Sequence, residues 1–200
     1  MKKTAIALGI LGALAATPVL AASPFAGPYV GGNLQYQNDS SRLNSTVGTS
    51  GQQSATGAGV GLEAGYGWRN GPNYLGVEAD GTLSTTHGSV DSALGTTKYE
   101  NHQQASLAVE PGVVIGNDQA LLYGRAGWAV ADGKISSTNY PAGDRTLNGP
   151  LLGVGVAVPV AQNVDAKLGY DHTWFEKETL GGSQITPSED AIRAGVDFHF

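Results

Sequence analysis

Seven charged residues recur at alternate positions in segments that otherwise carry small or apolar side chains. They are Glu63, Glu78, Asp80, Glu110, Arg125, Lys167 and Arg193. Acidic and basic side chains that share one enclosed space either pair with one another or line a hydrated ion path, because an unpaired buried charge is costly. The set therefore predicts either a packed ion-pair plug or a narrow pore.

Two pairings follow from counting residues away from the predicted turns. Glu110 falls opposite Arg125, which predicts an ion pair between neighbouring strands. Glu63 falls opposite Glu78 or Asp80, and two like charges in that position need a cation between them. The strand pattern of this chain predicts an eight-stranded barrel, and such a barrel leaves only enough room for its own side chains. We therefore expect paired side chains to close the interior.

One segment has residue types used in hydrolysis. Asp171, His172 and Thr173 are consecutive, and hydrolases combine a histidine with an acid and a hydroxyl. In a strand, however, neighbours point to opposite faces, so Asp171 points away from His172, and no serine lies near His172 in sequence. Nucleophile, base and orienting group must converge for catalysis, so we expect no enzyme and interpret His172 as an interfacial residue.

Ligand binding through loops is the next alternative. His87 and His102 lie at opposite ends of one long polar segment, and Tyr99 and Tyr140 lie in or beside such segments. Histidine and tyrosine can hold haem iron, but the two histidines have opposite strand parity. The four histidines and the absence of cysteine also give no structural zinc spacing. We therefore expect no cofactor and no metal.

The elements that must position these residues are β-strands. Apolar residues alternate with glycine or polar residues in a period of two, for example from Ala58 to Trp68. The pattern predicts eight strands, over residues 28–37, 58–68, 75–83, 103–115, 121–130, 149–158, 164–171 and 192–200. Most approach the 9 to 11 residues that a tilted strand needs to cross a bilayer, by the general estimate of about 30 Å for its apolar core.

The connections alternate in length. Residues 69–72, 116–119 and 159–163 are short segments with Asn-Gly, Asn-Asp or Pro, which suit tight turns. The other links are long and polar, and they occupy residues 38–55, 84–101, 131–148 and 176–190. This order predicts an antiparallel up-and-down barrel with short periplasmic turns, long extracellular loops and both mature termini in the periplasm.

The two faces of the strands distinguish a membrane barrel from a soluble one. A soluble eight-stranded barrel has an apolar interior and a polar exterior, whereas here one face carries Gly, Glu, Asp, Arg and Lys and suits a narrow polar lumen. Aromatic residues near strand ends predict two girdles at the membrane surfaces. They are Trp68, Phe198 and Phe200 on the periplasmic side, and Tyr36, Tyr170 and Trp174 on the other.

The N-terminus has the form of an export signal. Lys2 and Lys3 precede an apolar stretch, and small residues predict cleavage after Ala21, or after Ala22. An uncleaved anchor is the alternative, but the stretch is short for a spanning helix. Without the two lysines, nine basic residues face 17 acidic ones, a net charge of −8 that argues against nucleic acid as a partner.

Three strands resemble those of small OmpA/OmpX-like, opacity-type outer-membrane barrels. Residues 29–34 (YVGGNL) resemble their first strand and residues 75–81 (LGVEADG) their third. The last ten residues, AIRAGVDFHF, look like the terminal signal of outer-membrane proteins, with Gly195, Phe198 and Phe200 as its marks, and the leader MKKTAIA is similar to the OmpA-type leader. The resemblance implies recognition by the barrel-assembly machinery. It does not extend to the peptidoglycan-binding domain of OmpA, so no cell-wall tether is implied.

These observations predict a non-enzymatic outer-membrane barrel that presents its loops for adhesion or antigen-type interactions. Its expected surroundings are the lipid and lipopolysaccharide of a Gram-negative outer membrane. The alternatives are a lipid A-modifying enzyme of the outer leaflet, a haem- or ligand-binding surface barrel, and a narrow pore.

Overall fold

The structure is a computed structural model of the chain, and it describes residues 24–44, 51–92, 95–137, 140–176, 178–180 and 183–200. Its strands are β1 (Gly27–Asn44), β2 (Gly51–Asn70), β3 (Asn73–Ser92), β4 (Gly95–Ile115), β5 (Ala120–Ser137), β6 (Tyr140–Ala161), β7 (Val164–Trp174), β8 (Glu178–Leu180) and β9 (Ser183–His199). The expected leader, residues 1–21, lies outside the described residues.

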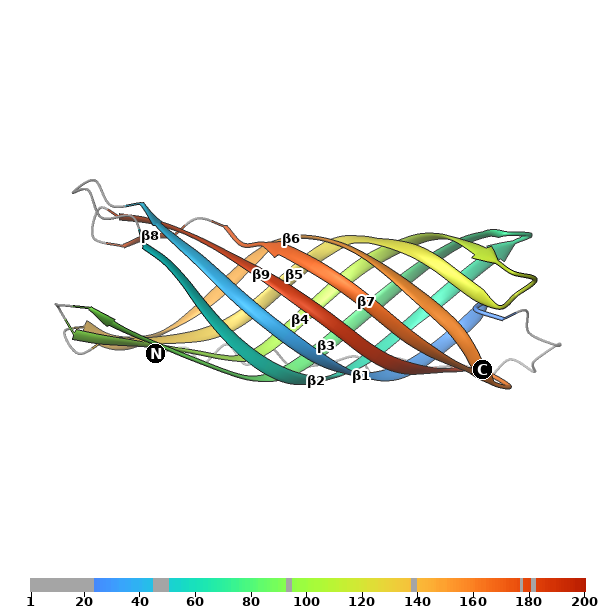
Figure 1. Cartoon of the computed structure of the whole chain (residues 1–200), viewed down its shortest axis with the longest axis horizontal. Helices are drawn as coiled ribbons and strands as arrows, with labels where there is room; N and C mark the ends of the chain where they lie inside the picture. Colours follow the sequence, from blue (N-terminus) through green and yellow to red (C-terminus); the bar gives the residue numbers. More distant parts are fainter. Residues whose placement is uncertain (1–23, 45–50, 93–94, 138–139, 177, 181–182) are drawn as a thin grey trace.

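The strands form one closed antiparallel barrel of eight positions (Figure 1). Each strand from β1 to β6 pairs with the next. β9 pairs with β7 and also with β1, and the β1–β9 pairing runs from Tyr29↔His199 to Asn44↔Gln184. The short β8 also pairs with β9 and so continues the position of β7. Closure leaves no open sheet edge, because the first and last long strands satisfy each other's backbone groups. The predicted eight-stranded antiparallel barrel is confirmed.

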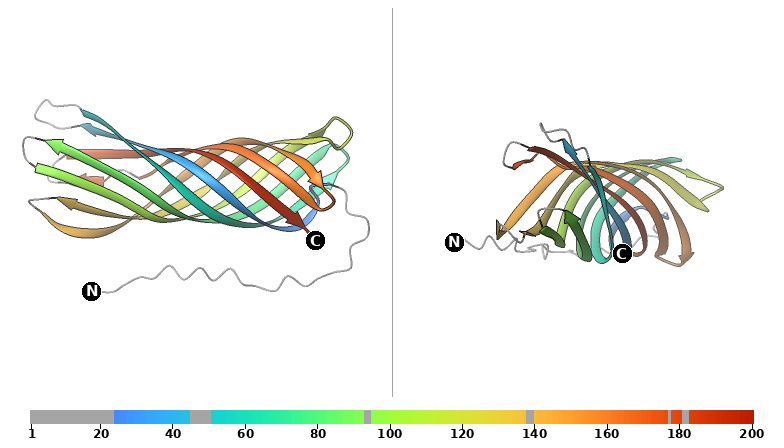
Figure 2. Two further views of the ribbon diagram at one scale, coloured as in Figure 1. Left: turned by 60° about the horizontal axis from the view of Figure 1, so that its bottom comes forward. Right: turned by 60° about the vertical axis from the view of Figure 1, so that its left-hand side comes forward.

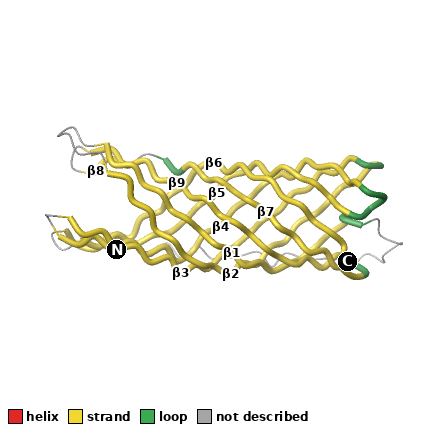
Figure 3. Tube along the Cα trace, in the orientation of Figure 1, coloured by secondary structure: helices red, strands yellow, loops and turns green. Residues whose placement is uncertain are grey.

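The short turns lie where the sequence places them, at the same end of the barrel as the C-terminus (Figure 3). Gly71, Gly116, Asn117, Asp118 and Asn163 all have positive φ values, between 53° and 71°. Glycine adopts this backbone region without strain, and Asn and Asp tolerate it better than other residues. These residue types therefore fix the hairpins at the positions that the sequence predicts.

The strands at the opposite end are longer than expected (Figure 2). Of the expected loop at residues 38–55, β1 takes the part up to Asn44 and β2 begins again at Gly51. The expected loops 84–101 and 131–148 are also largely paired strand, and β9 begins at Ser183, inside the expected loop 176–190. The alternation signal fades there because it records burial of one face, whereas backbone pairing needs no buried face. We call these extensions the long hairpins.

The side chains divide sharply between the two faces of the barrel wall. Large apolar residues face outward and remain exposed, among them Leu62 at 71%, Leu34 at 64% and Val154 at 63%. The six predicted girdle residues Tyr36, Trp68, Tyr170, Trp174, Phe198 and Phe200 also face outward, as do Tyr66 and Trp128. Polar and charged side chains fill the inside, which is the inverse of a water-soluble barrel. Within the described residues there is no helix long and apolar enough to cross a membrane.

Candidate functional site

The interior holds a cluster of ionisable side chains centred on Glu78 of β3, which is fully buried. Its carboxylate lies 3.0 Å from an Arg125 nitrogen, 2.5 Å from Lys167 Nζ and 3.3 Å from an Arg193 nitrogen. The Tyr29 hydroxyl donates a further hydrogen bond to Glu78 Oε2 at 3.0 Å. One carboxylate thus joins β1, β5, β7 and β9 across the inside of the barrel. We call Glu78, its three basic partners and the other acids that these bases contact the lumen cluster. Those acids are Glu63, Glu110, Asp171 and Asp197.

Arg125 of β5 spreads its guanidinium over three acidic residues. Besides Glu78, it contacts Asp171 Oδ2 at 2.6 Å and Glu110 Oε1 at 3.5 Å. The planar guanidinium presents donors in several directions, which suits it to bridge carboxylates on different strands. Arg125 is only 3% exposed, so these contacts replace the water that it loses.

Arg193 of β9 and Arg125 share one acceptor. Arg193 Nε lies 2.9 Å from the same Asp171 Oδ2, and its terminal nitrogen also lies 3.5 Å from Glu63 Oε2. Two like charges therefore lie close together but are held apart by the carboxylates of Asp171 and Glu78. The arrangement is a mutually dependent network, because each base contacts at least three acids.

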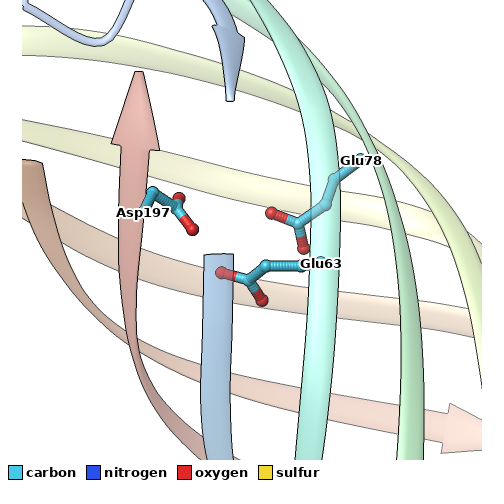
Figure 4. A group of neighbouring side chains, drawn as sticks. All are labelled: Glu63, Glu78 and Asp197. Carbon is cyan, nitrogen blue, oxygen red and sulfur yellow. The ribbon is translucent and has the colours of Figure 1, made fainter. Parts of the chain in front are cut away.

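The carboxylates of Glu63, Glu78 and Asp197 point toward one another (Figure 4), and all three contact Lys167 of β7. Its ammonium is 3.4 Å from Glu63, 2.5 Å from Glu78 and 3.0 Å from Asp197. The ligand atoms of these acids lie within 4.8 Å of one another, a spacing that would suit a metal ion. The sequence indicated a cation between Glu63 and either Glu78 or Asp80, and in the structure the Lys167 ammonium lies between Glu63 and Glu78.

The register decides which acid lies opposite Glu63. Asp80 is its direct partner across β2 and β3, whereas Glu78 pairs with Gly65. Asn33 separates the two acids, because its side-chain amide donates to Glu63 at 2.6 Å and to Asp80 at 3.1 Å. A neutral donor between the carboxylates lowers their repulsion without another charge.

Side-chain amides continue from Asn33 toward the long hairpins. Gln35 donates to Asn33 Oδ1 at 3.0 Å and to Thr82 Oγ1 at 2.7 Å, and Gln37 donates to Gln104 at 3.1 Å. All of these side chains are buried. This ladder of amides occupies the lumen between the lumen cluster and the long hairpins.

The other end of the lumen, near the short turns, is closed by aromatic and apolar side chains. Phe25, Tyr74, Val114, Leu121, Tyr123 and Ala157 pack into one buried group. Beside it, His199 Nε2 lies 2.8 Å from Asp165 Oδ2, and the Tyr29 ring packs against His199. A void of only about 10 Å³ remains between this group and the lumen cluster, at most the space of a single water molecule.

Inward glycines make room for these side chains. A Cβ atom at Gly65 would overlap the Tyr29 ring, and one at Gly153 would overlap the Asp171 carboxylate. These two positions therefore need glycine because a long side chain from a neighbouring strand crosses above the backbone. Such crossings allow a narrow barrel to hold arginine, lysine and tyrosine together.

The structure brings all seven charged residues singled out in the sequence into the lumen, and it adds others. Asp171 and Asp197 contact the basic residues directly, and Tyr29 and Asn33 supply neutral donors. Their strand parity already placed Asp171 and Asp197 on the inner face. Parity alone gave no reason to select them, because the contacts cross the lumen between strands that are distant in sequence.

His172 faces outward, and the structure places beside it a carboxylate that its neighbours in sequence do not supply. Asp171 and Thr173 do point inward, as expected, but an orienting carboxylate comes from β9: Asp190 Oδ1 lies 2.6 Å from His172 Nδ1. His172 and Asp190 are direct cross-strand partners. The outward Ser188 donates its hydroxyl to the Ser40 carbonyl at 3.5 Å.

The residues considered for haem cannot be placed as ligands. His87, His102, Tyr99 and Tyr140 lie in strands, but their side chains are outside the described part of the chain.

Comparison with known proteins agrees with this architecture. The family model for the outer membrane protein β-barrel domain matches residues 5–200. The chain belongs to the outer-membrane protein β-barrel family. This outer-membrane barrel is 28% identical to a 22 kDa outer membrane protein of Rhizobium leguminosarum bv. viciae, over 92% of the chain and 82% of that protein. It is also 28% identical to outer membrane protein A of Klebsiella aerogenes, over its whole length but only 56% of that relative.

Two solved structures share the fold of this outer-membrane barrel. OprG of Pseudomonas aeruginosa has a TM-score of 0.59 at 14% identity, over 89% of this chain and 99% of that one. The outer membrane protease OmpT of Escherichia coli has a TM-score of 0.50 at 10% identity, over 92% and 100%. At these identities the likeness concerns the fold. The family places the protein in the Gram-negative outer membrane, and the exposed apolar belt fits lipid surroundings.

Proposed function

We propose that this outer-membrane barrel is a closed, non-enzymatic scaffold that presents its long hairpins outside the cell. The observation that carries the proposal is the lumen cluster, in which Arg125, Lys167 and Arg193 contact carboxylates on opposite sides of the barrel. Every contact is buried, and a layer of packed aromatic side chains lies at the short-turn end. An interior filled in this way transmits neither ions nor solutes at a steady rate.

The proposed orientation places the long hairpins outside and both mature termini in the periplasm, after removal of residues 1–21. The alternation of short and long connections supports it, since outer-membrane barrels have short periplasmic turns. The terminal segment with Gly195, Phe198 and Phe200 is the proposed signal for the assembly machinery. Binding to an extracellular partner, for adhesion or as an antigen, then falls to the hairpins, because exposed segments on a rigid frame carry recognition.

Planar bilayer recordings test the closed lumen. Purified protein is expected to give no steady large conductance, and at most small, rare openings that increase when Arg125 is replaced by Ala. Glu176→Gln serves as the control, since Glu176 is exposed and accepts a hydrogen bond of 3.4 Å from the Asn148 side chain. Stable, porin-sized steps from the unmodified monomer would reject the scaffold and identify a transport protein.

Hydrolysis in the outer leaflet is a second candidate, because Asp190 orients the His172 imidazole as a carboxylate does in hydrolases. The Ser188 hydroxyl is directed to a backbone carbonyl, so we propose that the pair has no nucleophile among the described side chains. Lipid A and phospholipids from cells with the protein, without it and with His172→Ala should show identical acyl patterns. A pattern that changes with the protein and reverts with His172→Ala would establish an enzyme.

A further inference from the structure

Two neighbouring strands separate before they reach the end of the long hairpins. β2 and β3 pair with each other only as far as Gly59↔Ser84. Among the described residues, the outer part of β2 then pairs with β1 alone, and the outer part of β3 pairs with β4 alone. Figures 1 and 2 show the outer end of β2 beside β1 and β9, apart from β3 and β4. The wall of the barrel is closed, but the long hairpins beyond it have sheet edges.

Three edges of the long hairpins differ in how they are protected. The outermost strand of a sheet presents backbone N–H and C=O groups to any strand that lies beside it, so proteins usually protect edges with proline or charge. The outer part of β6, beyond its pairing with β7, carries Pro141, Asp144 and Arg145, and the outer part of β3 carries Asp91. Residues 51–57 of β2 (GQQSATG) contain neither proline nor a charged residue. We call residues 51–57 the β2 edge, and of the three it is the one without protection.

Antiparallel pairing of two identical edges fixes how the two copies are oriented. Their two-fold axis is perpendicular to the sheet that the two strands join. The wall of an upright barrel runs across the membrane, so an axis perpendicular to that wall lies in the membrane plane. Rotation about such an axis turns the second barrel upside down, so two copies in one membrane cannot pair in this way. Two copies in facing membranes can, because their long hairpins point toward each other.

We propose that the β2 edge pairs antiparallel with the β2 edge of a second copy in a facing membrane. The inference rests on the proposed function and deepens it, because it names the partner of the long hairpins. The absence of charge supports a second copy as the occupant. Identical edges bring like residues near each other in a two-fold register, and like charges directly opposite are destabilising, so an uncharged edge is the kind that can pair with itself.

Clustering of vesicles tests the pairing. One pair of short strands is weak, because it buries less surface than a stable interface needs, but many pairs between two surfaces act together. The full barrel is placed in phosphatidylcholine vesicles with many copies each, and two vesicle populations are labelled in different colours. We expect the fraction of two-coloured particles to be at least about tenfold higher than for protein-free vesicles.

An exchange of charge identifies the edge. Gln53→Lys with Thr56→Lys should abolish clustering, since a two-fold pairing centred between these positions sets like charges opposite each other. Gln53→Glu with Thr56→Glu should abolish it for the same reason, whereas a mixture of the lysine and glutamate vesicles should cluster again. The chain has a formal net charge of −6, so general attraction between the surfaces would instead make the lysine variant cluster more than the unmodified protein.

Ser89→Lys with Ser92→Lys is the matched control. It places the same charges at the same spacing on the outer part of β3, and it should leave clustering unchanged. Equal loss of clustering in this control would overturn the β2 edge as the contact.

Folding of each variant is checked by its shifted gel mobility without boiling. The proposal is overturned if the unmodified protein does not cluster vesicles, or if its vesicles cluster equally with protein-free ones, which would identify lipid as the partner. Undiminished clustering of the lysine variant, or a lysine and glutamate mixture that stays dispersed, would also overturn it. If the lysine variant does not fold, the glutamate variant is compared with Ser89→Glu and Ser92→Glu together, and equal clustering of the two rejects the proposal.

The vesicle assay and the bilayer recordings can fail separately. Clustering does not depend on which end of the barrel faces outward in the cell, and conductance does not depend on clustering. Dispersed vesicles with a silent bilayer would therefore reject the pairing and leave the closed scaffold standing.

Discussion

Neutralising Glu78 should weaken this outer-membrane barrel more than any other single carboxylate-to-amide change. Glu78→Gln keeps the shape of the side chain but removes the charge that Arg125, Lys167 and Arg193 share. The new amide also turns a donor toward basic groups that can only donate. The loss therefore combines a missing ion pair with a buried donor that has no acceptor.

The magnitude follows from what each base retains. Arg125 keeps Asp171 and Glu110, and Lys167 keeps Glu63 and Asp197. Since no base is left alone, we expect a loss near the lower end of the range for breaking a buried ion pair, about 3 kcal/mol.

Two matched variants calibrate this value. Glu110→Gln removes one ion-pair contact of 3.5 Å and should cost about 1–3 kcal/mol, the range for a buried polar group that loses its partner. Glu176→Gln changes an exposed side chain and should cost about 0–1 kcal/mol. The free energy of unfolding is measured by urea titration in lipid vesicles, with gel mobility as the readout of the folded barrel. If Glu78→Gln unfolds at the same urea concentration as Glu176→Gln, the lumen cluster contributes nothing to stability and the reasoning is refuted.

Three further predictions concern the lumen and the terminus. Lys167→Ala leaves three carboxylates within 4.8 Å of one another and should destabilise the barrel by about 3–5 kcal/mol. Millimolar Ca²⁺ should restore part of this stability in the variant and have no such effect on the unmodified protein. If Ca²⁺ leaves the loss unchanged, the role of Lys167 as a shared cation is refuted. Gly153→Ala should cost about 1–3 kcal/mol because its Cβ displaces the Asp171 carboxylate, and a stability equal to that of an outward Gly32→Ala control would contradict this. The backbone N–H of Phe200 donates to the Pro28 carbonyl at 3.1 Å. Deleting Phe200 should reduce the heat-modifiable fraction of the protein in outer membranes far more than trimming any long hairpin. Normal assembly of the shortened protein would refute the terminal signal.

The sequence by itself determined the barrel, its strand order and its two faces. Alternation with a period of two is a local property, because it depends only on which side of the wall each residue faces. The turns are also local: Asn117 and Asp118 have positive φ values where the sequence predicted a hairpin. Inner charged residues such as Glu110 and Arg125 could be selected from parity, and their contact from counting across one turn.

Only the tertiary structure decided which inner residues meet across the lumen. Lys167 of β7 contacts Glu78 of β3, and Asp171 of β7 contacts Arg125 of β5, although neither pair lies on adjacent strands. Such contacts depend on how far the tilted strands are staggered when the barrel closes, a quantity set by all strands together. The same closure aligns Asp190 with His172, whose orienting partner was invisible in the local sequence. Local patterning therefore fixes the side of the wall on which a residue lies, and closure fixes its neighbours.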